Sequence, residues 1–201
     1  MVFFLYYSRH NMPADDDEDS GCGYKILECL ESDSVALVAH CNAVGGETDN
    51  LTFGDGQFHL TAQDEVQFIR GLKENGNGLL MCAKLEGSGS VIAVGSCLSK
   101  GRRSAHVYEF GISVRIGHWG KGVGTSLMSR IIAESRMRFG AEKISLAVLA
   151  SNSRARTMYE RFGFVTEGRL SRGFKFPDGR YEDEIVMGYV FPESDQEIVD
   201  T

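Results

Sequence analysis

A glycine-rich segment in the middle of the chain holds the residues best suited to chemistry. It runs GHWGKGVGTS over residues 117–126 and comes directly before apolar residues at helical spacing. Residues without a Cβ atom let backbone N–H groups approach a ligand, and a helix N-terminus adds free N–H donors and about half a positive charge. The segment therefore predicts a site for a phosphate or pyrophosphate group, with Lys121 as a further positive charge.

Spacing separates this segment from other phosphate-binding loops. The P-loop pattern G-x-x-x-x-G-K-[ST] fails because Lys121 is followed by Gly122. The dinucleotide-binding pattern G-x-G-x-x-G belongs to the first strand–helix unit of its fold, and neither the glycine spacing nor the mid-chain position agrees with it. A nucleotide-phosphate binder that uses the same loop stays an alternative, for which ATP or NAD would compete with the ligand.

A second group of residues follows about thirty positions later. Asn152, Ala155 and Tyr159 stand at i, i+3 and i+7. This spacing places them on one side of a helix, so that an amide and a phenol point at the same cleft with a small residue between them.

Hydrophobic periodicity predicts the elements that position these residues. A strand over 25–30 precedes a helix that begins at Asp33 and that Gly45-Gly46 is expected to end. The apolar side of this helix is predicted to hold Val35, Leu37, Val38 and Cys41, and a capping box of Thr61 and Asp64 begins the next helix. Further strands are predicted over 79–85, 90–99, 106–115, 144–149, 163–165 and 185–191, and further helices from Val123 and over 152–162. The order indicates a mixed α/β domain with antiparallel strands first and a strand–helix–strand passage in the second half.

Composition restricts the classes of protein that fit. The chain has 201 residues, of which 42% are hydrophobic and 24% charged, as in a globular protein with one domain. No run approaches the roughly 20 apolar residues of a membrane-spanning helix, and the apolar residues 1–7 lack the basic flank of a secretory signal. We expect a cytoplasmic protein without a membrane partner.

The net charge of −7 is concentrated at the ends of the chain. Residues 1–20 and 193–201 each carry −4, which leaves +1 for residues 21–192. A nearly neutral body argues against a nucleic-acid partner. We expect a flexible extension over 1–22, a domain over 23–192 and an acidic tail over 193–201. The five cysteines form no C-x-x-C pair and the five histidines are scattered, so we expect reduced thiols and no metal site.

Three motifs in the same order resemble the GNAT superfamily of N-acetyltransferases. Residues 119–124 are similar to its acyl-CoA loop [QR]-x-x-G-x-[GA], with Trp119 at the first position, and residues 109–114 match the strand before that loop. The later N-x-x-A-x-x-x-Y-x-x-x-G-F motif matches Asn152, Ala155, Tyr159, Gly163 and Phe164. The resemblance covers residues 24–191, and residues 167–187 resemble the branch that contains ribosomal-protein, spermidine and small-molecule acetyltransferases.

The resemblance implies a fold and a donor site. The fold is a central mixed, mostly antiparallel sheet of about six to seven strands with helices on both faces. The co-substrate is acetyl-CoA, and the residues implied to bind it are Ile112, Ser113, Val114, Trp119, Gly120, Lys121, Gly122, Val123, Gly124, Thr125, Asn152 and Ala155. Among these, the backbone of 112–114 holds the acetyl and pantetheine portions, residues 120–125 hold the pyrophosphate, and Asn152 bonds the pantetheine arm.

The resemblance also implies direct acetyl transfer to a primary amine, either a small molecule or a protein N-terminus. Tyr159 matches the position that protonates the departing thiolate, and Glu109 is the strand carboxylate best placed as the base. In the loop after the first helix, Glu47 and Asp49 are candidates to attract a cationic amine. The protein is expected to be a monomer or a homodimer. Two alternatives are a GNAT-fold protein that binds acyl-CoA without turnover and an acyltransferase with a longer acyl donor.

Overall fold

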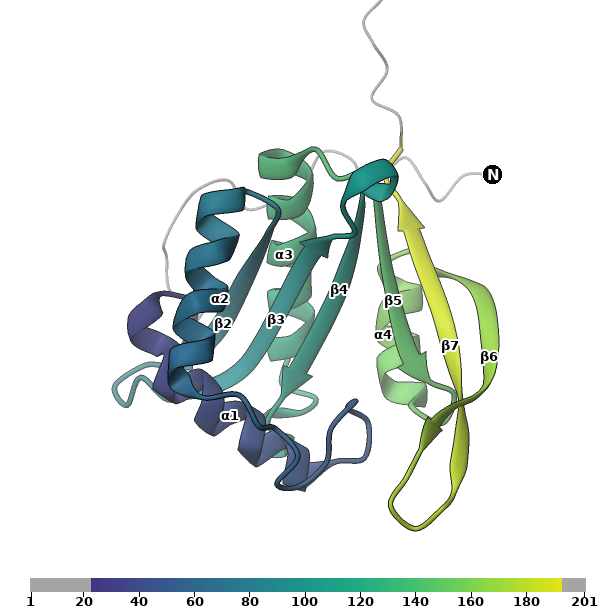
Figure 1. Ribbon diagram of the computed structural model, residues 1–201, viewed down its shortest axis with the longest axis horizontal. Coiled ribbons are helices and arrows are strands. Elements are labelled where there is room, and N and C mark those ends of the chain that lie inside the picture. The colour runs from purple at the N-terminus through teal and green to yellow at the C-terminus, as the bar shows by residue number, and fades with distance from the viewer. Residues whose placement is uncertain (1–22, 193–201) are drawn as a thin grey trace, which may run out of the picture.

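The computed structural model of the protein describes residues 23–192, and Figure 1 shows its ribbon. The predicted N-terminal extension and acidic tail lie outside the described residues. Seven strands form one sheet in the order β1-β2-β3-β4-β5-β7-β6. Their bounds are β1 Tyr24–Glu28, β2 Gly78–Leu85, β3 Val91–Ser99, β4 Val107–Val114, β5 Lys143–Leu149, β6 Val165–Lys175 and β7 Tyr181–Val190.

The strand pairing is mixed and mostly antiparallel, as predicted. β4 and β5 pair in parallel, whereas each other pair of neighbours in the sheet is antiparallel. The parallel pair is joined by the connection that carries the glycine-rich segment and the helix after it, because parallel neighbours need a crossover. The predicted fold class is therefore confirmed.

In the described part of the chain, four α-helices cover the two faces of the sheet. They are α1 Ser34–Glu47, α2 Ala62–Asn75, α3 Val123–Phe139 and α4 Ser153–Arg161, with short 3-10 turns η1 Glu31–Asp33, η2 Arg102–Ser104 and η3 Ile116–His118. α1 and α2 lie on one face, here named the front face, and α3 and α4 lie on the back face (Figure 1). Within residues 23–192, no helix has the length and apolar character needed to cross a membrane.

The hydrophobic core is divided by the sheet. The larger part packs α3 and α4 against the back face and includes Leu127, Met128, Ile131, Ile144, Leu146, Tyr159 and Met187. The smaller part lies under α1 and α2 and consists of Cys29, Leu37, Ile69, Leu80, Cys82 and Val91. Cys29, Cys82 and Cys97 are buried free thiols, as expected for cysteines that act as small apolar residues.

Three local predictions differ from the structure. α1 runs through Gly45-Gly46 to Glu47, because the backbone of the following loop packs on the helix there: a Cβ on Gly45 would lie 2.7 Å from the Gly54 carbonyl oxygen. Val35, predicted to be on the apolar side of this helix, is 71% exposed. The strand predicted over 163–165 is instead the long edge strand β6, which pairs with β7. Its polar sequence has no apolar alternation from which its length could be predicted.

Candidate active site

β4 and β5 lie side by side over only a short distance. Three residue pairs join them, the last being Glu109 with Ser145, and the strands then diverge (Figure 1). β4 stays paired with β3 as far as Val114, and β5 stays paired with β7 as far as Leu149. Beyond Glu109, no other described strand pairs with β4 on its β5 side. Since backbone N–H and C=O groups need partners, this stretch is suited to bind an extended ligand.

The β4 residues that were predicted to bind acetyl-CoA, Ile112, Ser113 and Val114, lie in this unpaired stretch. Ile112 and Val114 face the back of the sheet, because their side chains lie 4.0 Å and 3.4 Å from the position of a Cβ on Gly124 in α3. Ser113 alternates with them and faces the front, where its hydroxyl contacts α1. The backbone of 112–114 is thus open toward β5, while its side chains are held by helices on both faces.

The glycine-rich segment forms the turn from β4 into α3. Gly120 and Gly122 adopt φ of 72° and 83°, and nothing lies within 4 Å of a Cβ added to either. Their conformation is left-handed, which explains the glycines, and the space beside them is open. Gly122 is the N-cap of α3 and supplies no side-chain cap, so the first N–H groups of the helix are free to bind an anion. Exposed Lys121 lies between the two glycines.

Trp119 connects this turn with both neighbouring elements. Its indole Nε1 donates a hydrogen bond of 2.7 Å to the carbonyl of Val114, at the end of β4. The Arg154 guanidinium of α4 lies 4.8 Å from the centre of the indole ring. The tryptophan that stands where the acyl-CoA loop usually has Gln or Arg therefore holds the loop against β4 and places a cation beside it.

The polar residue at the start of α4 has a structural role besides its predicted one. Asn152 is the N-cap of the helix, and its Oδ1 accepts a hydrogen bond of 3.2 Å from the backbone N–H of Ala155. The side-chain Nδ2 group is not used by this cap, so it can still donate to a ligand. Ala155 is half-buried against the core.

Tyr159 and Glu109 lie on opposite sides of β4. The Tyr159 ring is buried and packs edge-on against Phe110, with ring centroids 6.3 Å apart. Burial raises the pKa of Tyr159 to about 12, so the phenol keeps its proton at neutral pH. Glu109 points away from Phe110 and is exposed, with its carboxylate 3.7 Å from Lys100. An acid on the back and a base on the front can serve two reactants that arrive from opposite faces.

Known proteins share this fold. The model of the acetyltransferase (GNAT) family matches residues 48–164, more than half of the chain. The chain belongs to the GNAT family. A GNAT acetyltransferase from Streptococcus pneumoniae, solved as a crystal structure, has a TM-score of 0.79 and 25% identity over 84% of this chain and 99% of its own. A putative acetyltransferase from Salmonella typhimurium, solved with its cofactor acetyl-CoA, has a TM-score of 0.74 and 20% identity over 86% and 96%.

Curated relatives match parts of this GNAT chain. Spermidine N(1)-acetyltransferase of Vibrio cholerae is 40% identical over 75 residues, which are 37% of this chain and 43% of the relative. The matched part of the chain thus spans less than half the length of that relative. Family membership confirms the resemblance, whereas the roles of the individual site residues stay predictions.

A buried histidine that the sequence analysis did not single out contacts strand β4. His40 of α1 is 2% exposed, and its Nε2 lies 2.9 Å from the hydroxyl of Ser113. Its Nδ1 lies 3.4 Å from the carbonyl of Val91. Burial lowers the pKa of His40 to about 4, so the ring is neutral and can donate from Nδ1 and accept from Nε2. Its burial could have been predicted from its spacing, because it lies three residues after Leu37 and four before Val44, which are both buried on the same side of α1.

The two acids considered as attractors of a cationic amine are already paired. Glu47 accepts hydrogen bonds of 2.7 Å from Arg115 Nε and from the backbone N–H of Ile116. Burial works against the charge of Glu47, but these bonds lower the pKa of its carboxyl. Asp49 lies 3.2 Å from Arg180 in the loop between β6 and β7. Both carboxylates are therefore already paired with an arginine, so neither is free to attract a cationic amine.

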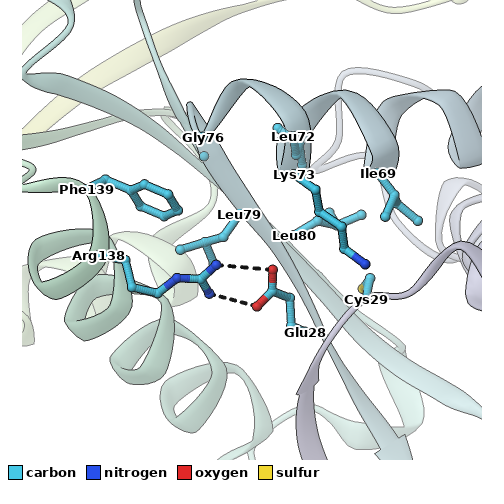
Figure 2. Close-up of a pocket in the computed structure, with 11 residues that line it drawn as sticks. Glu28, Cys29, Ile69, Leu72, Lys73, Gly76, Leu79, Leu80, Arg138 and Phe139 are labelled. Atoms are coloured by element: carbon cyan, nitrogen blue, oxygen red, sulfur yellow. Dashed lines mark hydrogen bonds and ion pairs between the residues drawn. The ribbon is translucent and has the colours of Figure 1, made fainter.

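Two hollows lie along the sheet. The smaller, of about 60 Å³, is lined by Glu28, Lys73, Arg138 and Phe139 among others, and Arg138 closes it with hydrogen bonds of 2.7 and 3.4 Å to Glu28 (Figure 2). Phe139 ends α3, so this hollow lies at the far end of that helix from the glycine-rich turn. The larger, of about 400 Å³, lies against β3 and β4 and includes Glu109. Within residues 23–192, no group of three His, Cys, Asp or Glu could hold a metal ion.

Proposed function

We propose that the protein is an acetyl-CoA-dependent N-acetyltransferase that transfers an acetyl group directly to a primary amine. The observation that carries the proposal is the unpaired edge of β4 that leads into the N-terminus of α3. An extended amide-containing arm would continue the sheet along 112–114, and the pyrophosphate would lie on the free N–H groups after Gly122. The GNAT neighbour solved with acetyl-CoA supports this choice of donor.

The two proposed catalytic residues divide the proton transfers between them. The amine loses its proton to Glu109, directly or through water, and its nitrogen attacks the thioester carbonyl. A C–N bond forms and the C–S bond breaks, and the departing thiolate takes the proton of Tyr159. The nitrogen that formed the new bond then gives up its surplus proton, which restores the phenol of Tyr159. The raised pKa of Tyr159 keeps that proton available at neutral pH. Hydrogen bonds from the backbone of β4 would polarise the carbonyl.

Release of CoA in the presence of an amine panel tests the proposal. We expect wild type to release CoA with at least one amine and Tyr159→Phe to lower kcat by roughly a hundredfold or more with unchanged acetyl-CoA binding. Tyr189→Phe is the matched control, because Tyr189 is a partly buried tyrosine that packs on Phe164 and Phe191 instead of Phe110. It should keep wild-type activity.

Three other outcomes would change the proposal. Acetyl-CoA binding without CoA release for any amine would favour a regulatory GNAT-fold protein. Faster transfer from longer acyl-CoA donors would favour a different acyltransferase. Full activity of Tyr159→Phe would remove the proposed acid and leave the donor site in place.

A further inference from the structure

The larger hollow lies where the front face of β4 meets β3. It measures about 400 Å³ and is lined by Ser96, Leu98, Ser99, Lys100, Glu109, Phe110 and Gly111. Small-molecule sites begin at about 300 Å³, so this hollow is sized for a small acceptor. It includes the proposed base and adjoins the residues where β4 parts from β5.

The hollow contains one charge of each sign. Lys100 and Glu109 are the ionisable residues among those lining it, and Lys100 Nζ lies 3.7 Å from Glu109 Oε2. Both side chains are substantially exposed, at 42% and 65%. An ion pair this exposed adds little stability. Each group can therefore exchange its partner for an opposite charge on a ligand.

The backbone that carries Lys100 is held in place. Its N–H donates a hydrogen bond of 2.9 Å to the carbonyl of Val107. The hydroxyl of Ser99 accepts one of 3.1 Å from the N–H of Gly101 and donates one of 2.9 Å to the carbonyl of Ala105. These bonds close the loop between β3 and β4, so Lys100 is presented from a fixed position.

The loop that carries Lys100 has further positive charge. Arg102 and Arg103 are exposed, and neither forms an ion pair with another residue in the range 23–192. Together with Lys100 they outnumber the carboxylate of Glu109. This balance attracts an acceptor with an anionic group and repels a polycation such as spermidine.

We propose that Lys100 binds the carboxylate of the acceptor and that the acceptor is an α-amino acid. The amine and carboxylate of such a molecule sit on one carbon, so its opposite charges match the separation of Lys100 and Glu109. With the carboxylate on Lys100, the amine lies at Glu109, gives its proton to that residue and takes the acetyl group. The inference rests on the proposed function, since it names the acceptor of that reaction.

Matched acceptors test the inference directly. CoA release is measured at saturating acetyl-CoA with each of the twenty standard amino acids, with leucinamide and isoamylamine as leucine analogues that lack the carboxylate, and with spermidine. We expect transfer to amino acids to exceed transfer to the two analogues and to spermidine. For the best amino acid, Lys100→Met should raise KM roughly tenfold to a hundredfold with little change in kcat, because a hydrogen-bonded charge is lost.

Two variants serve as controls. Lys25→Met removes a lysine that pairs with Glu86 at 3.6 Å and is also exposed, so it should leave the KM for the amino acid and the KM for acetyl-CoA unchanged. Lys100→Arg keeps the charge and should retain most of the affinity for the amino acid. The dissociation constant of acetyl-CoA should be the same in all of these proteins.

The outcomes separate the two proposals. Preference for spermidine or for the uncharged analogues, or an equal effect of Lys100→Met on all acceptors, would overturn the inference and leave the acetyltransferase proposal standing. If no amine is acetylated, the proposed function fails. Calorimetric titration of the amino acids into the CoA-saturated protein then decides the inference. The inference requires that an amino acid binds and that Lys100→Met weakens this binding by roughly tenfold or more.

Discussion

Acidification should destabilise the fold through His40. Its ring is buried and held between Ser113 and Val91, so protonation places a charge where Nε2 already accepts a hydrogen bond. The perturbation is a change from pH 7.5 to pH 5, applied to wild type and to His40→Gln. Glutamine has no titrating group and can still bond with Ser113.

The size of the effect follows from the two pKa values. Burial lowers the pKa of His40 from 6.5 to about 4 in the folded protein. Because the folded pKa is depressed, the unfolded chain binds more protons between these values, and stability falls as the pH falls. The contribution is fully present above pH 6.5 and is lost by pH 4, with a total of about 3 kcal/mol. Between pH 7.5 and pH 5 the expected loss is about 2 kcal/mol.

Urea unfolding monitored by circular dichroism measures this loss. The free energy of unfolding of wild type should fall between pH 7.5 and pH 5 by about 2 kcal/mol more than that of His40→Gln. His106→Gln, a change of an exposed histidine, is the control and should follow wild type. The reasoning is refuted if His40→Gln shows the same pH dependence as wild type.

Two further substitutions test the packing around the site. Asn152→Ala removes the N-cap of α4 and should lower the free energy of unfolding, measured in urea, by about 1 kcal/mol. Asn152→Asp keeps the cap acceptor and should only raise KM for acetyl-CoA. Equal stability of both variants would contradict the capping role. Gly95→Ala places a Cβ 2.6 Å from Ile131 Cδ1 and should lower the free energy of unfolding by about 1–3 kcal/mol. Adding Ile131→Val should recover part of this stability. An unchanged midpoint of thermal unfolding would contradict the close packing of α3 on β3.

The parts of the site that sequence predicted are local ones. The turn before α3 and the alternation around Glu109 depend on residue types at short spacing, and strand and helix patterns repeat over a few residues. Gly122 is needed for a left-handed backbone and Asn152 for a helix start, whichever residues surround them. Residue types and short spacings are therefore enough to identify these features.

The parts that sequence could not predict depend on distant contacts. His40 and Ser113 are 73 residues apart, and only the packing of α1 on the front face brings them together. The end of α1 is set by the loop that folds back onto Gly45, which overrides the usual helix-ending effect of two glycines. The divergence of β4 from β5 is a property of the whole sheet, and no local pattern in either strand encodes it.

The central claim is that the glycine-rich turn and the unpaired edge of β4 form an acetyl-CoA site. Calorimetric titration of acetyl-CoA into wild type and Gly122→Glu tests it most directly. Gly140→Glu is the control, because Gly140 is also left-handed with open space around it but lies at the other end of α3. We predict binding by wild type and by Gly140→Glu, and a loss of roughly a hundredfold in Gly122→Glu, where a carboxylate faces the pyrophosphate. Folded wild-type protein that does not bind acetyl-CoA, or equal binding by Gly122→Glu, would contradict the account.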